Sequence, residues 1–113
     1  MEPRLSSRVL ASALLRLAER HGGFGAILAK GDPDSGALTV ILAERGLRER
    51  VVERVTGPAG RLEWSEIGGR AAGNDSDFAL FLEKRRRMDP DLWLIELDVP
   101  SAERFADEMA AIG

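Results

Sequence analysis

The stretch from Asn74 to Val99 constrains the fold most, because it encodes a helix, a stop and a strand in immediate succession. The side-chain oxygen of Asn74 can accept a backbone N–H of the first helical turn, so Asn74 is predicted to cap the helix. Pro90 disfavours helical geometry at Asp89. The helix is therefore expected to end near Met88, after which the chain becomes extended.

Charge and hydrophobicity along this helix support the same prediction. Acidic residues come first and the basic run from Lys84 to Arg87 comes last, which is the order that the helix dipole favours. Glu83 and Arg87 are spaced for an i,i+4 ion pair. Arg85 falls nearest the apolar stripe, where its stem can pack while its head reaches a carboxylate. The apolar face at helical spacing comprises Phe78, Phe81, Leu82 and Met88.

The strand from Leu92 to Leu97 is the most apolar in the chain. One alternating set is wholly apolar, and it comprises Trp93, Ile95, Leu97 and Val99. The other set is apolar at Leu92 and Leu94 and acidic at Glu96 and Asp98. This pattern predicts an interior strand that is covered on one face and partly covered on the other.

An amphipathic helix is predicted near the N-terminus, capped by Ser6 or Ser7 and ended by Gly22 and Gly23. Its inner face is assigned to Val9, Leu10, Ala13, Leu14, Leu17 and Ala18. His21, the sole histidine, is interpreted as a residue at the helix end, where the dipole favours an imidazolium. This segment superficially resembles a signal peptide, but Arg8 and Arg16 interrupt its apolar run, so we expect a mature helix.

The middle of the chain reads as two hairpins. Strands are predicted at 24–30 and 37–43 around the turn 31–36, and the residues of that turn favour a bend. Residues 45–55 fit either a helical stripe or an alternating strand, and the turn at 56–60 with the strand-like segment 62–67 favours a strand. Residues 68–73 are predicted to form a loop. A short last helix is expected to begin after Ser101, with Ala102, Phe105, Ala106, Met109 and Ile112 on its apolar side.

The element order is therefore α-β-β-β-β-α-β-α. Hairpins with helices on one side predict an α+β fold, with a mainly antiparallel sheet of about five strands and two or three helices. A chain of 113 residues is expected to form a single domain, 1–113.

The runs MDPDLWLIELD and GDPDSGALTV, together with the Arg-rich helix end, resemble a small bacterial family known as domain of unknown function 1491. The resemblance extends from about Leu5 to Asp98 and is most specific in DPDLW and in GD-x-D-x-GA. It implies no activity and assigns no catalytic residue.

Composition excludes several classes of function. The chain has no cysteine, which excludes disulfides, thiol chemistry and cysteine-based zinc sites. Its net charge of −3 argues against a general affinity for nucleic acid. No apolar run approaches the length of about 20 residues that a membrane span needs, so a cytoplasmic location is expected.

Acidic turns are the first feature with possible chemistry. Asp-Pro-Asp occurs at 32–34 and again at 89–91. If the two turns met, Asp32, Asp34, Asp89 and Asp91 could offer oxygen ligands to Mg²⁺ or Ca²⁺ in a metal-dependent enzyme. The structural interpretation is that aspartate and proline simply serve the bends.

Two further features could bind a macromolecule. Arg85, Arg86 and Arg87 could grip phosphates, although no aromatic residues are interleaved with them and dipole complementation explains the run equally well. Trp64 lies among polar neighbours and would be an interface candidate if its strand leaves it exposed.

No Ser-His-Asp order, phosphate-binding loop or dinucleotide fingerprint is present in the sequence. We therefore expect a non-enzymatic protein without a cofactor that acts through association, either with itself as a homodimer or with another protein. Nucleic-acid binding through the Arg-rich helix end, and a metal-dependent enzyme built on the acidic turns, are the alternatives.

Overall fold

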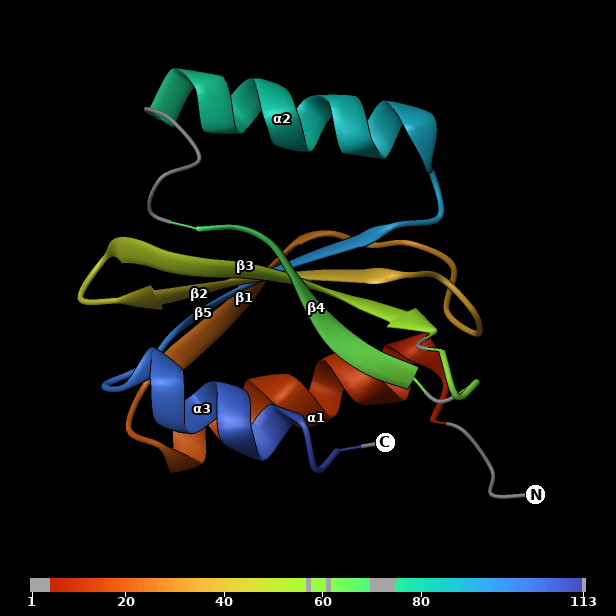
Figure 1. Cartoon of the computed structure of the whole chain (residues 1–113). Helices are drawn as coiled ribbons and strands as arrows, with labels where there is room; N and C mark the ends of the chain where they lie inside the picture. Colours follow the sequence, from red (N-terminus) through yellow and green to blue (C-terminus); the bar gives the residue numbers. More distant parts are fainter. Residues whose placement is uncertain (1–4, 57, 61, 70–74, 113) are drawn as a thin grey trace.

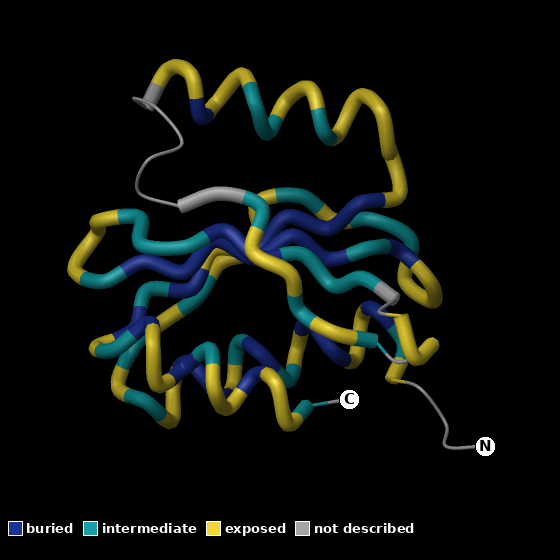
Figure 2. Tube along the Cα trace, in the orientation of Figure 1, coloured by how far each residue is buried: buried dark blue, intermediate teal, exposed yellow. Residues whose placement is uncertain are grey.

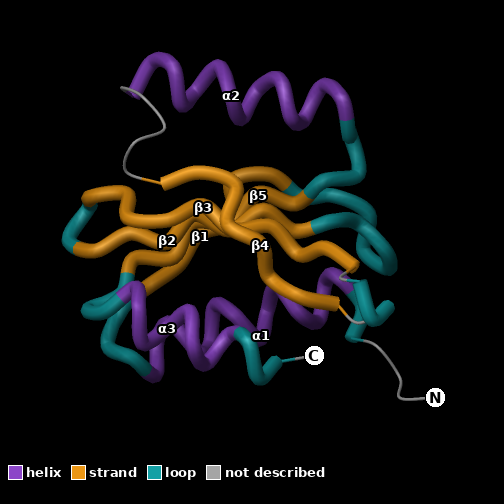
Figure 3. Tube along the Cα trace, viewed as in Figure 1, coloured by secondary structure: helices purple, strands orange, loops and turns teal. Residues whose placement is uncertain are grey.

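The computed structural model describes residues 5–56, 58–60, 62–69 and 75–112. These residues form three helices and five strands (Figures 1 and 3). In chain order they are α1 (Ser7–Arg20), β1 (Phe24–Ala29), β2 (Leu38–Glu44), β3 (Leu47–Thr56), β4 (Leu62–Gly69), α2 (Asp75–Met88), β5 (Trp93–Asp98) and α3 (Ala102–Met109). This is the order predicted from the sequence. The ambiguous stretch at 45–55 is a strand, as predicted.

The strands form a single sheet in the order β1-β5-β2-β3-β4. β5 pairs parallel with β2, whereas the pairs β1–β5, β2–β3 and β3–β4 are antiparallel. The sheet is therefore mixed, although mostly antiparallel, which corrects the expected mainly antiparallel sheet. The predicted hairpin of the first two strands is also wrong, because β5 lies between β1 and β2. β5 takes this position because its apolar residues on both faces are best buried in the middle of a sheet.

The helices cover both faces of the sheet, with α1 and α3 on one side and α2 on the other (Figure 1). The expectation that helices lie on one side is therefore wrong. The main core lies beneath α1 and α3, where Trp93, Ile95, Leu97 and Val99 point inward as predicted. From the two helices, Leu10, Leu14, Phe105 and Met109 pack against them.

The caps predicted for α1 and α3 are confirmed. The Ser6 side chain accepts the Val9 amide at 3.3 Å, and the Ser101 side chain accepts the Arg104 amide at 3.2 Å. Gly22, just after α1, has a φ of +84°, which a glycine adopts without strain. The predicted inner face of α1 is wrong at Val9, which is exposed. The buried face of the helix is rotated relative to the prediction, so that it includes Ser7 and Ala11.

α2 packs on the opposite face through a smaller cluster, in which Phe78 is buried against Ile41 and Val51. Phe81 and Leu82 are partly buried there, as the apolar stripe predicts. Met88 is exposed, which corrects its placement on that face, because the helix ends there and the chain leaves it to enter β5. Figure 2 shows α2 exposed along its outer side.

Two predictions fall wholly or partly outside the described residues. Asn74, the predicted cap of α2, is one of them. Of the predicted loop at 68–73, Gly68 and Gly69 belong to β4 instead, and the remainder also lies outside the described part. Among the described residues, no helix is both long enough and apolar enough to cross a bilayer.

Candidate functional site

The two Asp-Pro-Asp turns do come together, through their backbones. The Asp32 amide donates to the Asp91 carbonyl at 3.0 Å. The indole Nε1 of Trp93 donates to the Asp32 carbonyl at 2.7 Å. A Cβ added to Gly31 would lie 2.0 Å from the Asp91 carbonyl oxygen, so only glycine allows this approach. The contact fixes the start of β5 against the turn that precedes β2.

The carboxylates of these turns serve the bends. Asp32 accepts hydrogen bonds from the backbone and side chain of Ser35, at 2.8 and 3.1 Å, and from the Asp34 amide. The hydrogen bonds from Ser35 hold the pKa of Asp32 below its ordinary value. Asp89 accepts the Asp91 amide at 3.2 Å. Within the described residues, no three His, Cys, Asp or Glu side chains gather as a metal site would require.

The first turn also anchors α1. The amides of Ser7 and Arg8, which have no partner within the helix, donate to the carbonyls of Asp34 and Pro33. The Ser7 hydroxyl donates to the Gly36 carbonyl at 2.6 Å in a buried setting. These contacts favour the structural interpretation of the acidic turns, and the metal-dependent alternative gains no support.

Two of the four basic residues at the end of α2 form ion pairs. Arg85 pairs with Glu53 on β3, and its side chain is partly buried there. This confirms the prediction that its stem packs while its head reaches a carboxylate. Arg87 pairs with Glu83 at 3.0 Å, as the spacing predicted. Arg86 is exposed. The run therefore does not form the basic groove that the nucleic-acid alternative needs.

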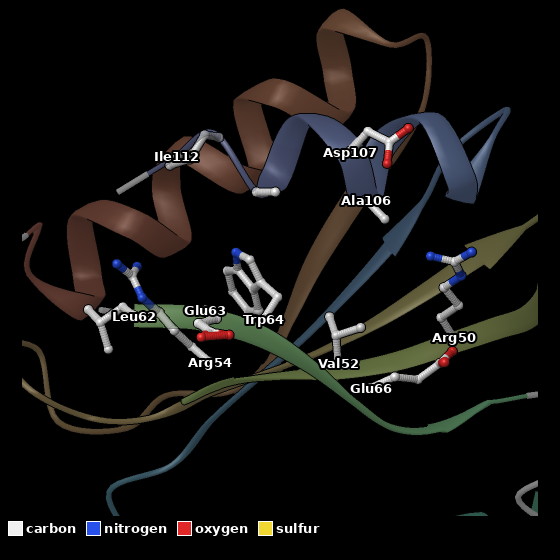
Figure 4. A pocket seen from close by; sticks show the side chains of 11 residues that line it. Arg50, Val52, Arg54, Leu62, Glu63, Trp64, Glu66, Ala106, Asp107 and Ile112 are labelled. Carbon is white, nitrogen blue, oxygen red and sulfur yellow. The ribbon is translucent and has the colours of Figure 1, made fainter. Parts of the chain in front are cut away.

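Trp64 is partly exposed, as its polar neighbours predicted, and it donates its indole N–H to the Met109 carbonyl at 3.2 Å. It stands in a pocket of about 370 Å³ between the sheet and the end of α3, with Arg50 towards one end and Arg54 towards the other (Figure 4). Acidic side chains from β4 and α3 also line this pocket, so its charge is mixed. The mixture of basic, acidic and apolar side chains in this pocket does not match one particular class of ligand.

His21 ends α1, as predicted from its position. Its Nε2 lies 3.0 Å from a carboxylate oxygen of Glu108, and its ring meets Phe105 edge-on at 5.3 Å. The contacts join the end of α1 to α3. These contacts with α3 give His21 a structural role.

An apolar groove of about 620 Å³ lies on the α2 face of the sheet, and sequence reasoning did not predict it. α2 packs over Ile41 and Val51, whereas Leu28 of β1 and Leu47 beside the groove are at least half exposed. Glu96 and Arg48 are its charged lining residues, and the Arg48 guanidinium lies 3.7 Å from the Phe78 ring centroid. The apolar lining, which defines the α2 groove, comprises Leu28, Ile41, Ala43, Leu47, Phe78, Ala79 and Leu82.

A tight turn presents Leu47 at the groove. Arg45 and Gly46 both have positive φ, 52° and 80°, which is the geometry of a two-residue hairpin turn. The Asp98 carboxylate accepts both of their amides, at 3.1 and 2.7 Å. Leu47 follows directly and is 69% exposed. The turn is therefore held firmly while it displays a large apolar side chain to solvent.

The edge strand β1 continues this apolar surface. Phe24 is 65% exposed and Leu28 is 50% exposed. Both share the α2 face with Ala26, because alternate residues of a strand point to the same side and Ala26 lies opposite Glu96. A signal was present in the sequence: the segment FGAILA is apolar on both alternating sets, which an unprotected edge strand rarely is.

Comparisons with known proteins give one consistent result. The family profile described as "Protein of unknown function (DUF1491)" matches residues 5–107, close to the range of the resemblance seen in the sequence. No curated protein matches the chain.

Three solved structures with the same fold show the similarity. A crystal structure of a DUF1491 family protein from Caulobacter crescentus CB15 has a TM-score of 0.76 at 28% identity, covering 89% of this chain and 94% of that one. An NMR structure of a DUF1491 family protein from the same organism has a TM-score of 0.76 at 28% identity, with 92% and 94% covered. The solution structure of a protein from A. tumefaciens has a TM-score of 0.72 at 28% identity, with 88% and 89% covered.

Proposed function

We propose that this chain, which belongs to the DUF1491 family of proteins of unknown function, is a non-enzymatic protein that acts through association with another protein chain. The surface that carries the association is the α2 groove together with the exposed face of β1. The proposal extends to self-association as well as to a different protein. A location in the cytoplasm belongs to the same proposal.

The observation that carries the proposal is the exposure of large apolar side chains around one concave surface. Leu28 and Leu47 line the α2 groove and are at least half exposed, and Phe24 lies on the same face of the sheet. Soluble proteins rarely leave such side chains gathered at one place unless a partner covers them. Burying Leu28 and Leu47 fully would contribute about 1.5–3 kcal/mol each if they started fully exposed, and proportionally less here.

The polar part of the groove fits a protein partner as well. Arg48 and Glu96 stand in the lining with opposite charges, so the groove presents polar groups of both signs beside its apolar residues. An apolar centre with polar groups around it is the usual make-up of a protein interface. A highly charged ligand such as nucleic acid finds no matching field on this surface.

Photo-crosslinking in cells that express the protein tests the proposal. A photo-reactive benzoylphenylalanine replaces Leu47 in one variant and Leu28 in a second. Leu80 on α2 provides the control position, because it is 63% exposed, close to the 69% of Leu47, and does not line the groove. We expect discrete protein adducts from positions 28 and 47 and none from position 80.

Adducts that form equally at position 80 would show unspecific capture by any exposed apolar site and would remove the support for the groove. Absence of adducts at all three positions would mean that no protein covers this face. Mass spectrometry of each adduct identifies the partner as a second copy of this chain or as a different protein.

A further inference from the structure

The two edges of the sheet differ in a way that points to the partner. β4, at one edge, exposes Glu63, Ser65 and Glu66, which are polar or charged. β1, at the other edge, has the sequence FGAILA, without a charge or a proline. Natural sheets guard free edges with charges, prolines or covering segments, because an unpaired strand is a template for another. β4 carries such protection in its side chains, whereas β1 has only the irregularity of its pairing between Ile27 and Ala29.

We propose that β1 is covered by β1 of a second copy of this chain, so that the two sheets join into one across a two-fold axis. The inference rests on the proposed function, and it narrows the partner to the chain itself. In such a pair each strand supplies backbone donors and acceptors to the other, and the same surface patch is used twice.

The sequence of β1 is complementary to itself in one antiparallel register. With the two-fold axis at Ala26, Phe24 of each copy lies opposite Leu28 of the other, which brings the two large exposed side chains of the strand together. The residue that meets its own copy at the axis is alanine, which is small and uncharged. No charged residue lies between Phe24 and Ala29, so the pairing sets no like charges opposite one another.

Other registers are worse. A shift of the two-fold axis to Gly25 leaves Leu28 opposite Gly22, and a shift to Ile27 puts Phe24 opposite Lys30. A register that pairs even-numbered residues of one copy with odd-numbered residues of the other turns the apolar face of one strand to the opposite side of the joined sheet. The register of β1 on β5 shifts between Ile27 and Ala29, so the regular part of the strand ends near Leu28. The new ladder is therefore short, and the dimer is expected to depend on concentration.

The pairing also continues into the α2 groove. Leu28 is both a member of the β1 face and a lining residue of the groove, so a second strand beside β1 approaches the open side of the groove. The dimer would therefore cover Phe24 and Leu28 first and leave Leu47 at the margin. Changes at β1 should therefore weaken the dimer more than changes at Leu47.

The first test measures the mass in solution. Light scattering with size-exclusion chromatography, over roughly 1–500 μM, should show the wild-type mass rising from 12.3 kDa toward twice that value. Ala26→Lys should weaken the dimer at least about tenfold, because two lysines would meet at the axis. Within one copy the new lysine faces Glu96, its neighbour on β5, so the fold should be retained. Added salt should restore part of the dimer by screening the lysines.

Leu80→Lys is the matched control, since it makes the same charge change at an exposed residue on α2. It should leave the wild-type dimer unchanged. Circular dichroism and urea melts of both variants confirm that the fold persists. A dimer that survives Ala26→Lys unweakened would overturn β1 as the interface.

The second test uses the absence of native cysteine, so that an introduced thiol reports alone. Ala26→Cys should form a disulfide-linked dimer on mild oxidation, because opposite Cβ atoms in a paired ladder lie about 4.5–5.5 Å apart. Leu80→Cys should cross-link much more slowly. Equal rates at the two positions, or a wild type that stays monomeric to 500 μM, would overturn the second copy as the partner. Photo-crosslinked adducts to a different protein would then leave the proposed function standing, whereas no adducts would remove both.

Discussion

Truncating Trp93 to alanine should be the more damaging of the two tryptophan-to-alanine changes in this chain. Trp93 is 3% exposed, lies in the main core on β5 and donates to the Asp32 carbonyl at 2.7 Å. Trp64 is partly exposed at the margin of the same core and donates to the Met109 carbonyl at 3.2 Å. Both changes lose one hydrogen bond, so the difference between them measures burial.

The magnitude follows from the two environments. Removing a buried tryptophan side chain costs about 3–5 kcal/mol, through the lost transfer energy and the cavity that remains. The Trp93 change also leaves the Asp32 carbonyl without its indole partner. The lost hydrogen bond accounts for about 1 kcal/mol of the total cost. For Trp64 we expect about 1–2 kcal/mol, because part of its surface is already in water. A domain of this size has about 5–15 kcal/mol in total, so Trp93→Ala should lie near unfolding.

Urea melts followed by far-UV circular dichroism measure the difference without relying on tryptophan fluorescence. With a slope of about 2 kcal/mol per molar urea, a loss of about 4 kcal/mol lowers the midpoint by about 2 M. Trp93→Phe is the control, since it keeps an aromatic ring and most of the bulk but removes the N–H, and it should lose about 1–3 kcal/mol. Equal losses at the two positions, or a larger loss at Trp64, would refute the assignment of the core to β5.

Three further predictions concern charged residues. Arg85→Met should destabilise the protein by about 1–3 kcal/mol and speed amide exchange in α2, because it leaves the mostly buried carboxylate of Glu53 without its partner; unchanged exchange would contradict this. The double change Arg86→Glu and Arg87→Glu should change the free energy of unfolding, measured by urea melts, by less than about 1 kcal/mol, since exposed charges contribute little. Salt-sensitive DNA or RNA binding by the wild type, lost in that double variant, would count against the association hypothesis. The pKa of Asp32 is lowered from 3.8 in the folded state, so its ionised carboxylate stabilises the fold above that pH, and this stabilisation is lost as pH falls through the lowered pKa. The gap in urea midpoint between wild type and Asp32→Asn should therefore be largest near neutral pH and narrow below pH 3.8, and a gap that widens in acid would refute the linkage.

The candidate site was only partly predictable from the sequence. Arg85 was correctly assigned a packed stem and a carboxylate partner, because four consecutive basic residues on a helix must place one of them near the apolar stripe. The turns at Asp32 and Asp89 were correctly given a structural alternative, because aspartate hydrogen-bonds its own backbone in bends. The exposed apolar residues Phe24, Leu28 and Leu47 were not identified. Their role depends on which parts of the sheet a helix covers.

The sequence by itself determined the local elements of this protein. The end of α2 before Pro90, the caps at Ser6 and Ser101, and the inward set of β5 follow from backbone preferences and periodicity within a few residues. The order of helices and strands follows from the same local signals.

Only the tertiary structure decided how these elements meet. β5 enters between β1 and β2 because burial on both faces is satisfied only in the middle of the sheet, and no local signal names the neighbours of a strand. The same insertion makes β1 an edge and leaves Phe24 and Leu28 beyond the cover of α2. Exposure is a property of packing between segments far apart in the sequence, so the proposed association surface follows only from the complete fold.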